Sequence, residues 1–166
     1  MAPLTRSGSA KVTLPADDRI LITREFDAPP ELVYKAWTTP DLVMRWWAGH
    51  HGEMVSADID LRVGGGWRYV MRTRGGDDIA FHGEFRELVP GERIVTTEVF
   101  EGVPEPEELV LNVVTFEPSE SGGTALELLV LAHTLEVRDM ITGSGMEAGM
   151  QEQYDVLDEL VASLAS

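Results

Sequence analysis

The C-terminal stretch repeats apolar residues in steps of three and four, which keeps them on one face of a helix. The residues of this face are Met146, Met150, Tyr154, Leu157, Val161 and Leu164. The pattern predicts one long helix from Arg138 to Ala165. Its first half differs from its second, because Gly143, Gly145 and Gly149 stand there among methionines. Glycine weakens a helix by about 1 kcal/mol relative to alanine, and methionine fills irregular space. We therefore expect this half to lie over a cavity rather than over a filled core.

Upstream of this helix the chain alternates apolar and polar residues with a period of two, which predicts strands. The expected strands cover residues 19–26, 54–61, 67–72, 79–89, 93–101, 109–116 and 124–133. Two short helices follow the first strand, and each has a proline, Pro30 or Pro40, at its first position. Residues 1–18 are small and polar, which predicts a loose arm with order only near Val12 to Leu14. Residues 19–166 are expected to form a single domain.

This order of elements predicts an α+β fold, with an antiparallel sheet of about six or seven strands and a long helix across it. Such a sheet is wider than one helix, whose diameter is about 10–12 Å. A curved sheet wrapped round the helix therefore leaves a pocket between them, the usual kind of small-molecule site. A core filled by side chains is the competing outcome.

Several motifs resemble a known family. The segment Phe26 to Thr38 (FDAPPELVYKAWT) resembles the opening motif of the START-like (SRPBCC) superfamily. Trp46-Trp47 and the segments 65–69 (GGWRY), 82–85 (HGEF), 90–94 (PGERI) and 145–150 (GMEAGM) resemble its branch named after activators of the ATPase of the ninety-kilodalton heat-shock protein. The resemblance implies the helix-grip fold, with a sheet gripping the C-terminal helix and a cavity between them. Relatives of this superfamily bind lipids, sterols and other apolar molecules, and the resemblance supplies no universal catalytic residue.

Composition narrows the range of partners. The chain has 29 acidic and 13 basic residues and a net charge of −16, so we expect no nucleic-acid binding, which needs lysine and arginine for phosphate contacts. It has no apolar run long enough to span a membrane. It has no cysteine, so disulfides and thiolate chemistry are excluded. A cytoplasmic location is the simplest expectation, no cofactor is expected, and a homodimer remains an open alternative.

The candidate ligand site combines a strand wall and a helix wall. The predicted ligand-binding residues are Trp47, Trp67, Tyr69, Met71, Phe81, Phe85, Met146, Gly149, Met150 and Tyr154. The two-residue period places Trp67, Tyr69 and Met71 on one strand face. The competing interpretation is an ordinary core, because buried aromatic residues are normally core.

His82 and Glu84 share a strand face opposite to Phe81 and Phe85, so strand parity lets only one of these sets face a cavity. Facing inward, His82 and Glu84 are candidates for an acid–base pair; the alternative is a solvated pair. His50 and His51 are adjacent and point apart on an extended chain, so we expect no metal site and place them in a loop at the mouth of the pocket, opposite a second loop near Glu105.

These patterns favour a binding module for a small apolar or amphipathic ligand. An enzyme of the lyase, cyclase or hydrolase type that uses the same cavity is the second hypothesis. A co-chaperone-like interaction module is the third, and it requires an exposed apolar patch.

Overall fold

The computed structural model describes residues 10–49, 52–101, 108–143 and 146–165, and within them it has eight strands and four helices. The strands are β1 (Lys11–Ala16), β2 (Arg19–Phe26), β3 (Gly52–Ile59), β4 (Gly66–Thr73), β5 (Asp78–Val89), β6 (Arg93–Phe100), β7 (Glu108–Pro118) and β8 (Thr124–Leu131). The helices are α1 (Pro30–Thr38), α2 (Pro40–Trp46), α3 (Leu135–Thr142) and α4 (Met146–Ala165). The predicted α+β order of elements is confirmed.

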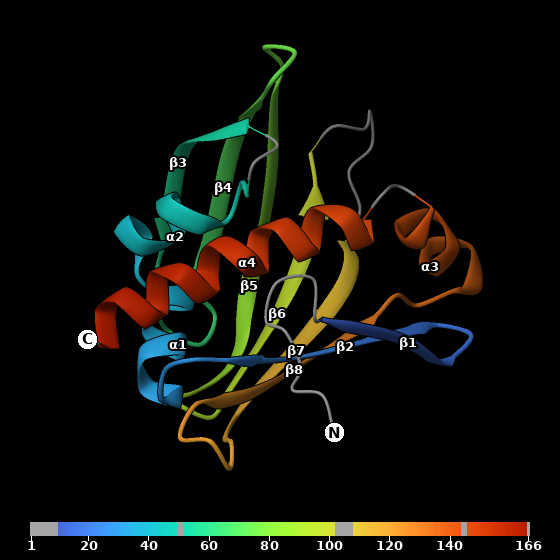
Figure 1. Cartoon of the computed structure of the whole chain (residues 1–166). Helices are drawn as coiled ribbons and strands as arrows, with labels where there is room; N and C mark the ends of the chain where they lie inside the picture. Colours follow the sequence, from blue (N-terminus) through green and yellow to red (C-terminus); the bar gives the residue numbers. More distant parts are fainter. Residues whose placement is uncertain (1–9, 50–51, 102–107, 144–145, 166) are drawn as a thin grey trace.

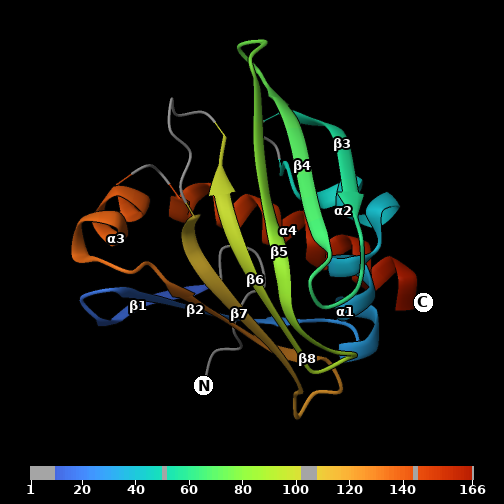
Figure 2. The same cartoon turned by 180° about the vertical axis from the view of Figure 1, so that it is seen from behind.

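All the strands belong to one antiparallel sheet with the order β1-β2-β8-β7-β6-β5-β4-β3. α1, α2 and α4 cover one face of this curved sheet (Figure 1), and the view from behind has the strands in front of α4 (Figure 2). We call the face toward α4 the inner face and the opposite one the outer face. This is the helix-grip arrangement that the sequence predicts.

The inner face carries the core, and its residues follow the two-residue period of the strands. Ile20, Ile22 and Phe26 of β2 are buried, and so are Leu126 and Val130 on the neighbouring β8. The intervening residues of β2 and β8 point to the outer face, where they are half-buried or exposed. Burial of the alternate residues therefore fixes the register in which these strands pair.

The two short helices close one end of the sheet. Pro30 and Pro40 occupy first-turn positions as predicted, and the N-cap residue of α2, Thr39, makes no side-chain capping bond. The indole of Trp46 donates a hydrogen bond of 2.9 Å to the Ala36 carbonyl. Because this bond satisfies the buried indole N–H, Trp46 locks α2 onto α1.

α4 is held to the sheet by a buried ion network. The guanidinium of Arg24 on β2 lies 3.0 Å from Asp155 and 3.8 Å from Asp158, and its side chain has no exposed surface. It also lies 5.2 Å from the ring centroid of Phe26. Asp158 accepts a hydrogen bond from the Asp27 N–H, where the chain leaves β2. These contacts fix the middle of α4 against β2.

Two elements differ from the sequence prediction. Residues 11–16 form β1, which includes the expected ordered stretch from Val12 to Leu14 and extends beyond it, because pairing with β2 supplies the backbone hydrogen bonds that their composition does not signal. The predicted helix 138–165 is two helices, since α3 ends at Thr142 with Gly143 as its C-cap residue. A glycine near a helix end suits this break, because it costs helix stability.

Candidate functional site

The aromatic side chains of the inner face form two separate groups of ring contacts. The ring of Tyr154 packs at 5.7 Å from Phe26 and 5.9 Å from Trp37. The second group centres on Trp47, at the end of α2, which lies 5.2 Å from Tyr69 and 5.3 Å from Phe81. The two expected walls of the site therefore take part in different aromatic groups.

The predicted ligand-binding residues also differ in exposure. Most of them are buried, namely Trp67, Tyr69, Met71, Phe85, Met150 and Tyr154. Trp47, Phe81 and Gly149 keep accessible surface. The structure does not describe the side chain of Met146, and His50, His51 and Glu105 lie outside the described residues. Between Met150 and Trp67 the described side chains pack as core, and the accessible part of the predicted site is the region of Trp47, Phe81 and Gly149.

Two polar residues lie on this part of the inner face. Glu98 on β6 has the same strand parity as the core residue Ile94, and Asn112 on β7 has that of Val114. The Asn112 amide donates a 3.0 Å hydrogen bond to one carboxyl oxygen of Glu98. Burial raises the pKa of the Glu98 carboxyl, yet both residues keep accessible surface. Glu98 and Asn112 are therefore part-buried polar residues of the inner face that keep contact with solvent.

Tyr69 lies near this polar pair. Burial raises the pKa of its hydroxyl, and the negative charge of Glu98 raises the same pKa further, so the two groups are near each other. In both views the first turns of α4 lie over β6 and β7 (Figures 1 and 2). We call Trp47, Tyr69, Phe81, Glu98 and Asn112 the Glu98 cluster.

Trp67 has a structural role beside this cluster. Its indole donates a 3.2 Å hydrogen bond to the carbonyl of Thr97 on β6, two strands away. The ring crosses β5 at Gly83, which stands opposite Trp67 in the register. A Cβ at Gly83 would lie 2.6 Å from the indole nitrogen and 1.8 Å from the Thr97 carbonyl oxygen. Gly83 is therefore required for this crossing, and Trp67 is a tie between strands rather than a free wall.

On β5 the side chains of Phe81 and Phe85 face the core, and those of His82 and Glu84 point to the outer face. The structure does not bring His82 and Glu84 together. His82 Nδ1 lies 2.7 Å from a carboxyl oxygen of Glu101, whereas Glu84 pairs with Arg86 at 3.3 Å. A catalytic hypothesis on this face thus involves His82 with Glu101 and not with Glu84.

Glu101 also accepts two hydrogen bonds of 2.9 Å from Arg68, the neighbour of His82 on β4. The Arg68 guanidinium, with a further contribution from His82, lowers the pKa of the Glu101 carboxyl from 4.5 to about 2. The three side chains form a surface network over β4, β5 and the end of β6. The Glu101 carboxylate therefore holds the imidazole ring of His82 in place through its Nδ1 atom.

We expect Glu101→Gln to lower stability at neutral pH by about 1 kcal/mol, a typical value for a partly exposed ion network. The pKa of Glu101 is lower in the folded protein than in the unfolded chain, so its contribution is complete above pH 4.5 and is lost as the pH falls toward about 2. Urea unfolding of both proteins between pH 7 and pH 3 measures this. The gap between them should narrow with acid, while Glu92→Gln, an exposed control, should show no such gap. A gap that is constant with pH would contradict the assignment.

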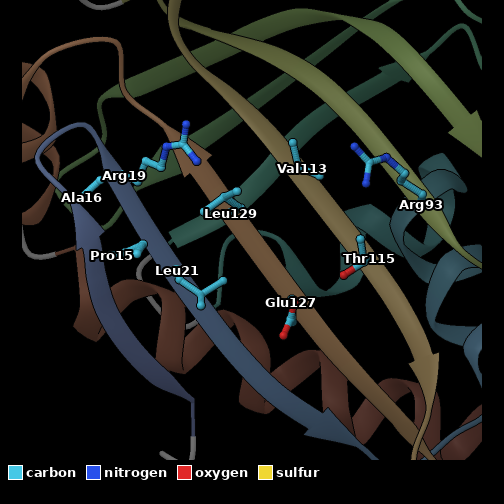
Figure 3. A pocket seen from close by; sticks show the side chains of 9 residues that line it. All are labelled: Pro15, Ala16, Arg19, Leu21, Arg93, Val113, Thr115, Glu127 and Leu129. Carbon is cyan, nitrogen blue, oxygen red and sulfur yellow. The ribbon is translucent and has the colours of Figure 1, made fainter.

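Two surface hollows lie elsewhere on the sheet. One, of about 430 Å³, is on the outer face over β1, β2, β8, β7 and β6 (Figure 3). Leu21, Val113 and Leu129 form its apolar floor, and Arg19 and Arg93 stand at its rim. The other, of about 470 Å³, includes Arg68, His82, Trp67 and Gly83 among its lining residues. Trp67 is the one residue of the predicted ligand site, as far as the chain is described, that borders either hollow.

Neither a metal site nor a membrane-spanning helix is found in the described part of the chain. No three or more histidine, aspartate or glutamate side chains gather there in a way that could hold a metal ion. None of the helices described has the length and apolar character that crossing a membrane requires.

Comparison with solved structures supports the fold. A protein from Rhodobacter sphaeroides is 27% identical, with a TM-score of 0.84 over 93% of this chain and 98% of that one. A protein from Chromobacterium violaceum is 28% identical, with a TM-score of 0.71 over 87% and 97%. A protein from Aeromonas hydrophila, described as AHSA1-like, is 22% identical, with a TM-score of 0.64 over 86% and 93%. No significant match was found among functionally curated proteins.

The family comparison covers most of the chain. The model of the family described as "Activator of Hsp90 ATPase homolog 1-like protein" matches residues 27–162, from the end of β2 into the last turns of α4. This segment includes the motifs that carry the resemblance, and the helix-grip sheet agrees with the START-like superfamily. The chain therefore belongs to the activator of Hsp90 ATPase homolog 1-like family.

Proposed function

We propose that the protein binds a small amphipathic molecule on the inner face of the sheet, between β5–β7 and the first turns of α4. The observation that supports this most is the Glu98–Asn112 pair. A carboxyl group that is partly removed from water costs stability unless it is paired, and these two residues lie on the inner face with part of their surface accessible. Groups held at such a cost are found preferentially at functional sites.

The apolar part of the site is supplied by aromatic rings beside this pair. Trp47 and Phe81 are half-buried and in contact, and Phe81 lies 5.1 Å from Phe100 at the end of β6. A mainly apolar wall with a few polar groups is typical of small-molecule sites. A molecule with an apolar chain and one polar end fits this combination.

The expected affinity follows from the buried chain. Each buried methylene contributes about 0.8 kcal/mol, and association costs at least about 4 kcal/mol. A fully buried decyl chain contributes about 8 kcal/mol, which leaves about 4 kcal/mol after this cost and corresponds to a Kd on the order of one millimolar before any polar contact.

The test is titration of the protein with decanol, followed by tryptophan fluorescence, which Trp47 makes sensitive to the site. Asn112→Phe places a ring into the proposed space and should weaken decanol binding by about tenfold or more. Asn112→Leu, a smaller change, should have the same direction and covers the case in which the phenylalanine variant does not fold. Native mass spectrometry of the protein purified from cells should in addition show a bound small molecule.

Val113→Phe is the matched control. Val113 is the next residue on β7 and points into the outer hollow (Figure 3). The same ring there should leave decanol affinity within about twofold, because the two faces do not share a cavity. Loss of binding in Val113→Phe with retention in Asn112→Phe would move the site to the outer face. No decanol binding to the unaltered protein would refute the proposal.

A further inference from the structure

The two oxygens of the Glu98 carboxyl group differ in their hydrogen bonding. Asn112 donates to one of its oxygens at 3.0 Å, and no hydrogen bond to the other oxygen is made within the described residues. Nor does Glu98 form an ion pair in that part of the chain. The part-buried carboxyl group of Glu98 is therefore left with a single neutral partner among the described residues.

The other side chains of the Glu98 cluster carry no positive charge that could pair with the Glu98 carboxylate. Tyr69 is a neutral hydroxyl, Asn112 is an amide, and Trp47 and Phe81 are aromatic rings. The arginines of this region, Arg68 and Arg72, bind Glu101 and Asp78 on exposed parts of the protein instead. A part-buried carboxylate that no cation of the described residues pairs with is stabilised further by a ligand that brings one.

We propose that the ligand is an amphipathic amine, whose ammonium group donates a hydrogen bond to the unpaired oxygen of Glu98 while its apolar part lies against Trp47 and Phe81. This inference rests on the proposed function and names the chemical class of its ligand. Charge-assisted hydrogen bonds are the strongest of their kind, and aromatic rings next to the site attract the cation as well.

The experiment compares three probes with the same apolar chain at pH 7: decylamine and decanoate, each below its micelle concentration, and decanol below its solubility limit. The unaltered protein should bind decylamine about tenfold more tightly than decanol, which is the gain expected from one charged hydrogen bond. Decanoate should bind most weakly, because its carboxylate is repelled by Glu98. Equal affinity for decylamine and decanol, or a preference for decanoate, would overturn the assignment.

The variant Glu98→Gln keeps an oxygen that can accept from Asn112 and removes the charge. It should lose the preference for decylamine, so that decylamine affinity falls by about tenfold, while decanol affinity stays within about twofold. We expect it to fold, since it removes a buried charge, and a thermal melt checks this. A preference for decylamine that survives in Glu98→Gln would contradict the role of Glu98.

The net charge of −16 attracts any amine, so a charge control is needed. Glu92→Gln removes the same charge from an exposed position and should leave the amine preference unchanged. A loss of preference in Glu92→Gln equal to that in Glu98→Gln would show general attraction and refute this inference. Failure of decanol to bind would refute the proposed function itself, whereas decanol binding without amine preference would refute the amine inference alone.

Discussion

Arg24→Ala is expected to lower the free energy of unfolding by about 3–5 kcal/mol, the typical cost of breaking a buried ion network from one side. Removal of the guanidinium leaves Asp155 and Asp158 without the cation that lies 3.0 Å and 3.8 Å from them. The nitrogens of Arg24 are fully buried and are not aligned for hydrogen bonds within the described residues. Arg24 therefore stabilises the protein through its charge and its packing. Urea is the suitable denaturant, since it leaves ion pairs unscreened.

Arg19→Ala on the same strand is the control for this prediction. Arg19 points to the outer face, where its pair with Asp18 is 3.6 Å long and about half-exposed. Such pairs contribute about 0–1 kcal/mol, so the control should unfold close to the unaltered protein. A loss below about 1 kcal/mol in Arg24→Ala would mean that the ion network does not hold α4 on β2.

Gly83→Ala should destabilise the protein by about 3 kcal/mol, through overpacking and the loss of a buried hydrogen bond. The added methyl group would lie 1.8 Å from a backbone oxygen, which cannot move away as a flexible side chain does. Either β5 and β6 separate further or the Trp67 indole leaves the Thr97 carbonyl. A shift in the near-ultraviolet circular dichroism of tryptophan would accompany the lower stability.

Gly66→Ala, at the start of β4, is the matched substitution. A Cβ there meets its nearest neighbour at 3.6 Å, an ordinary contact distance. The expected effect is below about 1 kcal/mol in either direction. Equal losses in the two variants would mean that the close approach at Gly83 does not decide its stability.

The sequence carries the architecture because periodicity records burial. The steps of three and four that end at Leu164 predict the helix, and the alternation around Trp67, Tyr69 and Met71 predicts a strand with one buried face. What they do not record is the helix break at Gly143 and the pairing of β1 with β2. The helix break falls at Gly143, one of three glycines in this stretch, and periodicity does not show which of them ends a helix. β1 is an edge strand whose residues are nearly all exposed, so it lacks the alternation of buried and exposed residues that predicts a strand.

The candidate site is less predictable because it depends on polar exceptions. Glu98 and Asn112 stand at inward positions of strands that otherwise alternate as expected, and a polar residue at such a position was the available signal. The partner of His82 was out of reach of local patterns, because Glu101 is 19 residues away in the chain. The aromatic residues were found, but periodicity cannot separate those that pack as core from those that border a space.

The family places this chain among proteins whose fold commonly encloses a ligand, and its name refers to chaperone activation. Fold alone does not fix function, so the functional claim rests on the Glu98 cluster. The Arg24 network and the Trp67 tie stabilise the sheet and α4 on both sides of that cluster. A rigid frame around a polar pair is what a pre-organised binding site needs.

The most direct measurement is isotope-edited NMR of the protein with a bound decyl probe, recording nuclear Overhauser effects between probe and protein protons. The account predicts contacts from the decyl chain to the Phe81 ring and from its polar end to the Asn112 side-chain amide. Contacts confined to the methyl groups of Leu21, Val113 and Leu129 would place the ligand in the outer hollow and contradict it.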